Sequence, residues 1–159
     1  MSNEGHIFQI NISQGGVPKN PIRSGEVTDL GLVGDVQRDK RYHGGPTRAL
    51  CLYPLELILE LQRKGHPIFP GSVGENITTA GLDFERLKVG DQLQIGALIV
   101  AVTDYAPPCA TIKGSFKDGK YSRISVKTHP GESRLYVQIL QTGTISIGDR
   151  IVVLERDAG

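Results

Sequence analysis

Short runs of alternating hydrophobic and polar residues recur along the chain and predict β-strands. In the run that begins at Arg134, for example, Leu135, Val137 and Ile139 fall on one face and the residues between them on the other. Frequent glycines and prolines separate the runs, which cover residues 6–13, 24–33, 48–53, 91–96, 97–105, 134–143 and 149–155. This pattern predicts a mainly β fold, with a mostly antiparallel sheet that forms a closed or partly open barrel.

One segment departs from this period and predicts a helix. Within residues 54–65 the helical spacing places Leu55, Ile58 and Leu59 on one face, together with Gln62. The segment begins with proline, which suits the first turn of a helix, and ends with glycine, which suits the position just past the end. We therefore expect one or more short helices beside the barrel.

The composition is that of an ordinary globular protein. The chain has 159 residues, of which 38% are hydrophobic and 22% charged. This length is enough for one domain with a core, and we expect a single domain over residues 1–159. The formal net charge of +1 gives no reason to expect a polyanion such as nucleic acid as a partner.

No segment predicts a membrane span or a secretion signal. The longest apolar stretch, residues 95–102, is too short to cross a bilayer, and the first residues lack the charged-then-apolar pattern of a signal peptide. Cys51 and Cys109 are the only two cysteines, which is no disulfide framework. We expect a protein of the reducing cytoplasm, without a membrane partner and with a free thiol at Cys109.

The two cysteines lie in different surroundings. Cys51 falls inside an apolar run, which predicts a buried structural thiol. Pro107 and Pro108 directly precede Cys109, and their rings fix φ and remove two backbone donors, so a regular internal strand is excluded there. We expect Cys109 on a stiff loop that leaves a buried strand and enters a short helical turn. A rigidly held thiol suits metal ligation or nucleophilic chemistry, and both need a thiolate, which the nearby Lys113 would favour.

A charged segment at residues 34–49 is a first candidate binding region. It gathers many charged residues, with His43 and Arg48 among the basic ones, around a glycine pair whose backbone amides could bind an anion. A solvated charged loop explains the same pattern. The four histidines of the chain are scattered, and no pair has the spacing of zinc ligands on one helical turn, so zinc is not expected.

Two further groups of polar residues offer candidate ligands. Asn76 and Thr78 lie in a glycine-rich turn, where they either bond to the local backbone or contact a polar heterocycle or phosphate. Arg123, Lys127 and Arg134 lie near the last long strand. They either protect the edge of the sheet or form part of an anion pocket shared with the glycine-pair loop.

Five motifs, taken together and in this order, resemble the MOSC domain family, named for the C-terminal region of molybdenum cofactor sulfurase. They are GLVGDVQRDKRYHGGPTRALCLYPLE, FPGSVGENITTAGL, KVGDQLQIG, PPC and PGESRLYVQILQTGTISIGD. The resemblance covers residues 18–153, and the chain looks like the small, stand-alone bacterial type. It implies a β-rich fold that resembles the barrel domain of pyruvate kinase.

The resemblance also implies a cofactor and a key cysteine, which falls on Cys109. In relatives that bind the molybdenum cofactor (molybdopterin), this cysteine ligates molybdenum, and such enzymes reduce N-hydroxylated compounds. Molybdopterin, not pyridoxal phosphate, is therefore the expected cofactor. The positions that match contacts to the pterin and its phosphate are Lys19, His43, Arg48, Asn76, Thr78 and Arg123. Longer bacterial relatives often carry an arginine shortly before the cysteine, and residues 105–108 contain none.

Three functions follow as hypotheses. The preferred one is a molybdenum-dependent oxidoreductase acting on a small-molecule substrate, which needs a separate electron donor protein because the sequence has no iron–sulfur cysteine set and no flavin or haem module. The second is a sulfur carrier that takes sulfur from a donor as a persulfide on Cys109, for assembly of a metal–sulfur cluster or cofactor. The third is a non-catalytic binding module for an anionic heterocycle.

Overall fold

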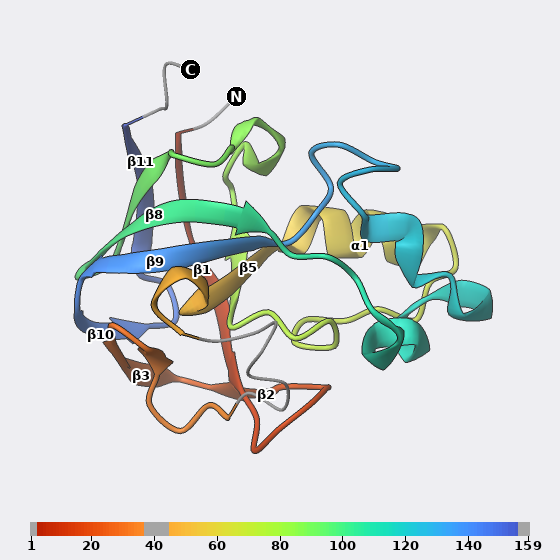
Figure 1. The fold of residues 1–159 in the computed structure, drawn as a ribbon, viewed down its shortest axis with the longest axis horizontal. Helices are drawn as coiled ribbons and strands as arrows, with labels where there is room; N and C mark the ends of the chain where they lie inside the picture. Colours follow the sequence, from red (N-terminus) through yellow and green to blue (C-terminus); the bar gives the residue numbers. More distant parts are fainter. Residues whose placement is uncertain (1–2, 37–44, 156–159) are drawn as a thin grey trace.

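A closed β-barrel forms the centre of the computed structural model, which describes residues 3–36 and 45–155 (Figure 1). Its seven strands follow the order β11-β7-β8-β9-β5-β6-β1, and pairing of β1 with β11 closes the ring. These strands are β1 (Glu4–Ile12), β5 (Leu50–Pro54), β6 (Ile77–Ala80), β7 (Gln92–Ile95), β8 (Leu98–Tyr105), β9 (Leu135–Gln141) and β11 (Arg150–Glu155). The expected mainly β barrel is confirmed, and it is closed.

Three short strands lie outside the ring. β2 (Asn20–Ile22) pairs with β1, while β3 (Ser24–Thr28), β4 (Gly31–Leu32) and β10 (Gly143–Ser146) form a small sheet. The described strand pairings are antiparallel except for β5 with β6. The alternation pattern did not predict β2, β6 or β10. β6 was missed because Thr78 was interpreted as part of a glycine-rich turn, whereas Ile77–Ala80 form a buried strand.

The predicted alternation sorts residues between the inside and the outside of the barrel. On β9, Leu135, Val137 and Ile139 belong to the barrel core, as expected from the sequence. On the neighbouring β5, Leu50 and Leu52 also face this core, and each fully buried side chain of this size contributes roughly 1.5–3 kcal/mol. Residues between these positions point to the outer face of the barrel wall.

Helix α1 (Leu55–Arg63) follows β5 directly and ends in a Schellman motif. Gly65 has φ of 94° and its N–H donates to the Gln62 carbonyl, while the next N–H, from His66, donates to the Leu61 carbonyl. The predicted helix is confirmed over most of its length.

The predicted helical face is wrong in part. The structure buries Leu57, Ile58 and Leu61, and Leu59 is 42% exposed. Apolar residues occur on both sides of α1, so the helical spacing alone did not fix the rotation. The direction in which the chain leaves β5 decides which side meets the rest of the protein.

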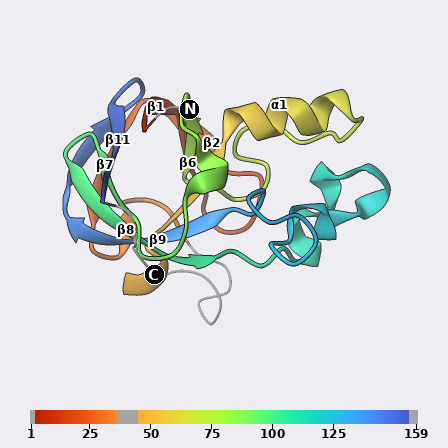
Figure 2. The same ribbon diagram turned by 90° about the horizontal axis from the view of Figure 1, so that it is seen from above.

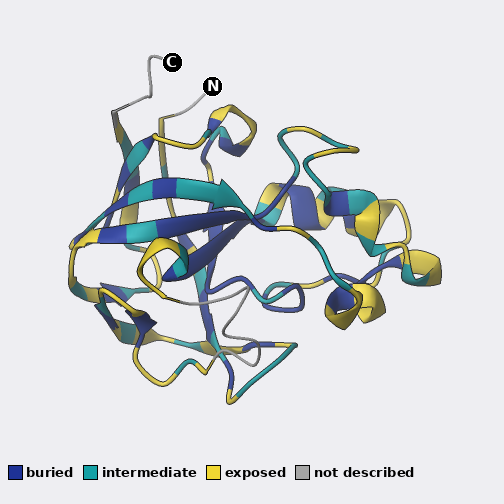
Figure 3. Cartoon of the chain, in the orientation of Figure 1, coloured by how far each residue is buried: buried dark blue, intermediate teal, exposed yellow. Residues whose placement is uncertain are grey.

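A second core lies against the outer face of the barrel. It combines Tyr53 on β5 with α1 and with apolar residues of two 3-10 turns, η3 (Ala110–Ser115) and η5 (Tyr121–Ile124), and with Phe116 between them. A third turn, η4 (Lys117–Gly119), has no buried residue. Figure 2 shows these helical elements together on one side of the barrel, and Figure 3 marks the buried stretches along them. Two further turns, η1 (Pro46–Arg48) and η2 (Phe84–Arg86), contribute little to this core.

The outer face of β5 and β9 is therefore covered where the helical side of the molecule meets the barrel. Cys51 and Tyr136 are direct cross-strand partners on this face, and they form a small cluster with Ala106. Within residues 3–36 and 45–155, no helix is long and apolar enough to span a bilayer.

Candidate functional site

A cavity of about 610 Å³ opens at this junction between barrel and helical elements. Three loop segments form its walls: residues 16–19 after β1, residues 73–76 before β6, and residues 107–112 after β8. The outer face of the barrel contributes Cys51 and Tyr136. Its size lies within the range of small-molecule and cofactor sites.

Cys109 lies in the wall of this cavity, where β8 ends. The last ladder bond on this side runs from the Ala106 N–H to the Arg134 carbonyl at 2.9 Å, after which the two prolines leave the sheet. Cys109 is extended, with φ of −137°, and caps η3, whose Ile112 N–H donates to its carbonyl. Its thiol is half-buried, and Sγ lies 2.8 Å from the Thr111 hydroxyl. The expected stiff loop followed by a helical turn is confirmed.

Arg134 joins two walls of the cavity. Its Nη1 donates to the Val73 carbonyl at 2.7 Å, and its Nη2 donates to the Pro107 carbonyl at 3.1 Å. The residue is only 4% exposed, and its Nε is buried without a hydrogen-bond partner. Among the described residues it forms no ion pair, so a buried positive charge and one free N–H donor remain beside the cavity.

Lys19 and Asn76 also line the cavity, but both are tied into a buried network around Asp35. Lys19 Nζ contacts both oxygens of Asp35 at 2.7 Å, and Asn76 Nδ2 donates to the same carboxylate at 2.9 Å. The Asn76 Oδ1 accepts the Cys51 backbone N–H at 3.0 Å. The Lys19 charge is thus already neutralised within the protein, and this network fixes the wall of the cavity.

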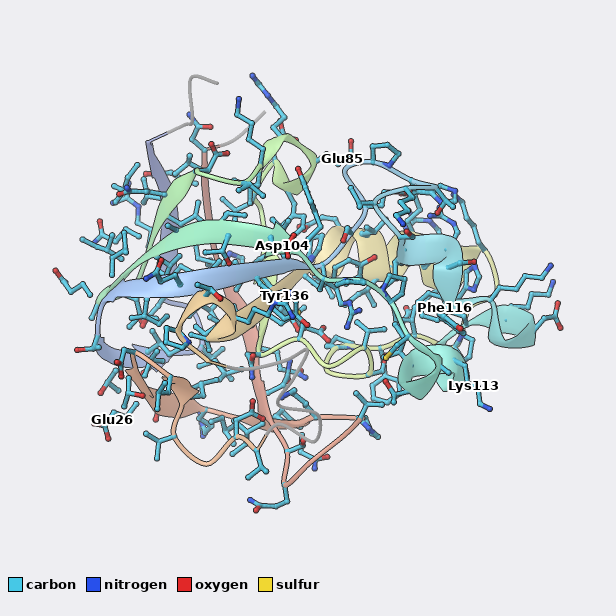
Figure 4. The ribbon with its side chains drawn as sticks, in the orientation of Figure 1. Glu26, Glu85, Asp104, Lys113, Phe116 and Tyr136 are labelled. Atoms are coloured by element: carbon cyan, nitrogen blue, oxygen red, sulfur yellow. The ribbon has the colours of Figure 1, made fainter. Side chains whose placement is uncertain are left out.

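Arg48, from η1, lies over the ring of Tyr136, with 5.3 Å from Cζ to the ring centroid. It also pairs with Asp104 at 3.5 Å, and its side chain is 29% exposed. Asp104 and Tyr136 are cross-strand partners on β8 and β9, and Figure 4 labels both at the adjoining strand ends. The Arg48 guanidinium therefore lies at an accessible edge of the cavity, stacked on an aromatic ring.

The second thiol of the cavity, Cys51, is 6% exposed. Burial raises the pKa of the Cys51 thiol to about 11, and the charge of Arg134 only partly opposes this shift. At neutral pH Cys51 is therefore protonated and weakly nucleophilic. Its prediction as a buried thiol is confirmed, although the structure also places it in the cavity wall.

Glu75 lies between two cavity residues of its loop but is fully buried. Its Oε2 accepts the Gly71 N–H and the Thr78 hydroxyl, each at 3.0 Å, while Oε1 has no partner. Burial raises the pKa of the Glu75 carboxyl to about 6, and these hydrogen bonds oppose the shift. Glu75 and Thr78 therefore hold the loop of residues 73–76 in place through buried hydrogen bonds, and neither residue lines the cavity.

The structure gathers only part of the predicted set. Cys109, Lys19, Arg48 and Asn76 line the one cavity. Thr78 lies on β6 with no exposed surface and is not among the lining residues, and Arg123 lines a different pocket. His43 falls outside the described residues. Lys113, expected near the thiol, is exposed and lines neither pocket (Figure 4).

Sequence reasoning did not single out Tyr136 on β9, and it named Arg134, just before this strand, only as part of an anion pocket with Arg123 and Lys127. The sequence did indicate their direction, because Arg134 and Tyr136 alternate with the core residues Leu135 and Val137. Their side chains are therefore expected on the outer side of the barrel wall. What the pattern could not show is that this outer face is covered. No group of three or more metal-ligating side chains occurs within the part of the chain that the structure describes.

The class of protein is thus a closed β-barrel with a half-buried thiol in a pocket on its outer wall. A family model described as the MOSC domain matches residues 39–152, and the chain belongs to the MOSC domain family. The uncharacterized protein YflK of Bacillus subtilis is 29% identical over 143 residues, which cover 89% of this chain and 64% of YflK. A protein named "Reductase" from Gibberella moniliformis is 28% identical over 79% of this chain and 23% of its own length.

The fold is shared with solved structures. The crystal structure of YiiM from Geobacillus stearothermophilus superposes with a TM-score of 0.77 at 27% identity, covering 98% of this chain and 77% of that one. The chain spans less than two thirds of the length of the curated relatives it matches.

Proposed function

We propose that the cavity binds the molybdenum cofactor and that the loaded protein reduces N-hydroxylated compounds. The observation that carries the proposal is the half-buried Cys109 thiol in the wall of a cofactor-sized cavity, together with the unpaired charge of Arg134. Membership of the MOSC family supports it, because that family is associated with this cofactor. The name of the reductase relative agrees with a redox role.

The residues of the cavity fit such a group. A thiolate at Cys109 is a soft ligand that suits molybdenum. The buried guanidinium of Arg134 places a positive charge beside the cavity, which favours an anionic group there, and Arg48 at the accessible edge offers a second guanidinium for a phosphate. Apolar side chains, such as Val17 and Val73, line much of the remaining wall and suit a flat heterocycle.

The protein contributes position and electrostatics. When bound, the molybdenum centre would supply the two-electron redox chemistry. Arg134 holds the loop of Cys109 through the Pro107 carbonyl and thereby fixes where the thiol points. Reduction of an N–OH group consumes two electrons and two protons and releases water. The electrons come from a separate donor protein, and a small-molecule substrate enters from the open side of the cavity.

Metal and pterin analysis tests the proposal. The chain is purified gently from cells that make the cofactor, alongside Cys109→Ser and, as a matched control, Cys51→Ala. We expect molybdenum and pterin at close to one per chain in the wild type and in Cys51→Ala, and loss of molybdenum from Cys109→Ser. Absence of both from the wild-type protein would overturn the proposal. Equal loading of Cys109→Ser would reject Cys109 as the metal ligand.

A persulfide carrier is the second candidate, favoured by the contrast between the two thiols. Cys109 is accessible, whereas Cys51 is protonated and buried. In this function the Cys109 thiolate attacks the sulfane sulfur of a donor persulfide, a new S–S bond forms, and the donor thiolate leaves with the electron pair of the old one. Mass spectrometry after incubation with a cysteine desulfurase should find one added sulfur on Cys109 alone. Equal addition to Cys51 would indicate unspecific chemistry.

A further inference from the structure

A second hollow has a volume of about 420 Å³, and its lining comes from residues 66 and 117–129. Figure 1 shows the helical elements of this region to one side of the barrel. The hollow lies between His66, just past the end of α1, and the segment of η4 and η5 that ends in the turn around His129. None of its lining residues lines the first cavity. The two sites are therefore separate, and the function proposed for the cavity of Cys109 leaves this hollow unexplained.

Positive charge dominates the lining of this second hollow. Lys117, Lys120 and Arg123 line it, against a single carboxylate, that of Asp118. In the described part of the chain, neither Lys117 nor Lys120 forms an ion pair. Arg123 pairs with Glu132 through Nη1 at 2.9 Å and Nη2 at 3.5 Å, which directs two of its five N–H groups at the carboxylate.

His66 adds a neutral donor to this charge. Its Nδ1 accepts the Lys117 backbone N–H at 3.0 Å, so the proton of the neutral ring lies on Nε2, which is then a donor. Burial and the charges of Arg123, Lys117 and Lys64 lower the pKa of His66, in that order of importance. The field at this ring is therefore positive, as expected of a site that attracts an anion.

Thr128 and His129 complete the opposite side. The Thr128 hydroxyl donates to the Ser122 carbonyl at 2.8 Å, so it accepts from Nδ1–H of His129 across their 3.0 Å contact. Fixed hydrogen bonds within the protein thus hold both imidazole rings in place at the hollow.

We infer that this second hollow is a binding site for a phosphate group. Ammonium groups without partners, a guanidinium with free N–H groups and an imidazole Nε2–H are the donors that hold phosphate in proteins. A dianion also relieves the mutual repulsion of Lys117, Lys120 and Arg123. The site is independent of the cofactor proposed for the first cavity, and Arg123 contributes to it instead of to the Cys109 cavity.

Proton NMR of the histidine rings tests the inference. The chain has four histidines, and a His66→Gln variant assigns the His66 signal. Inorganic phosphate is added at constant pH and ionic strength, with sodium chloride as the reference salt. We expect saturable shifts of the His66 and His129 signals, and phosphate should raise the pKa of His66 because its charge offsets the surrounding cations.

Paired variants make the test specific. Lys117→Gln combined with Lys120→Gln should weaken phosphate binding about tenfold, because each loses a charge-assisted hydrogen bond. Lys113→Gln removes an exposed lysine that lines neither pocket and should leave binding unchanged. Cys109→Ser should also bind phosphate normally, which separates this site from the proposed cofactor site. Equal shifts with chloride alone, or unchanged affinity in the double variant, would overturn the inference.

Discussion

Arg134 donates from Nη2 to the Pro107 carbonyl over 3.1 Å, two residues before Cys109 in the chain. This bond crosses from the residue just before β9 to the loop that carries the thiol, and the second bond of Arg134, to Val73, reaches the opposite loop. One buried guanidinium thus connects the Cys109 loop to another wall of the cavity. Residues 105–108 contain no arginine, and Arg134 brings a guanidinium to this loop from a distant part of the chain.

We predict that Arg134→Met lowers the free energy of unfolding by about 3 kcal/mol, because the buried Val73 carbonyl and the partly buried Pro107 carbonyl lose their charged donor. Urea denaturation measures the effect. Arg150→Met is the matched control, since Arg150 is exposed and its ion pair with Glu4 lies at the surface, where such pairs contribute about 0–1 kcal/mol. A loss as small for Arg134→Met as for the control would show that the two bonds do not hold the loops.

The buried pair of Lys19 and Asp35 should behave as a unit. Asp35→Asn leaves the Lys19 charge buried without its partner and should destabilise the protein by about 4 kcal/mol, with a similar loss for Lys19→Met. The double variant should lose clearly less than the sum of the two single losses, because no unpaired charge remains. A double-mutant cycle from denaturant unfolding measures the coupling. Strict additivity would contradict the prediction.

Glu75 should make stability depend on pH. Its pKa is about 6 in the folded protein against 4.5 for an ordinary glutamate, so the folded state holds the proton more tightly than the unfolded state. Its contribution is fully present below pH 4.5 and is lost as pH rises through 6, a decrease of about 2 kcal/mol. Measured against Glu75→Gln, which does not titrate, wild-type stability should fall over this window. A constant difference between the two would reject the raised pKa.

The two thiols should differ in reactivity. In native protein a thiol reagent should modify Cys109 and leave Cys51 unmodified, since Cys51 is buried and has a pKa of about 11. Cys109→Ser should abolish native labelling, whereas Cys51→Ala should preserve it, and both thiols should react in denaturant. Peptide mapping after timed labelling checks this. Comparable native rates at both positions would mean that Cys51 is exposed by local opening.

Much of the fold could be read from the sequence because local rules governed it. The seven runs predicted as strands located eight of them, because residues 24–33 cover both β3 and β4, and the proline and glycine that bracket α1 marked its two ends. Pro107 and Pro108 excluded a regular strand at Cys109, and the chain indeed leaves the sheet there. The fully buried β6 and the buried face of α1 were not predicted, because both depend on neighbours far away in sequence.

The candidate site also combines features that depend on local sequence with features that depend on distant neighbours. The sequence by itself determined the barrel and the position of Cys109 after a strand, because strand alternation and proline geometry act within a few residues. The order of the five motifs indicated the MOSC family. Only the tertiary structure decided which polar groups meet. It placed Arg134 beside the thiol and Arg123 at a different pocket, although the two lie eleven positions apart in the same basic segment. The physical reason is that the second core covers the outer face of β5 at Tyr53, while Ala106 and Arg48 lie against Tyr136 of β9, which turns a barrel surface into a buried wall.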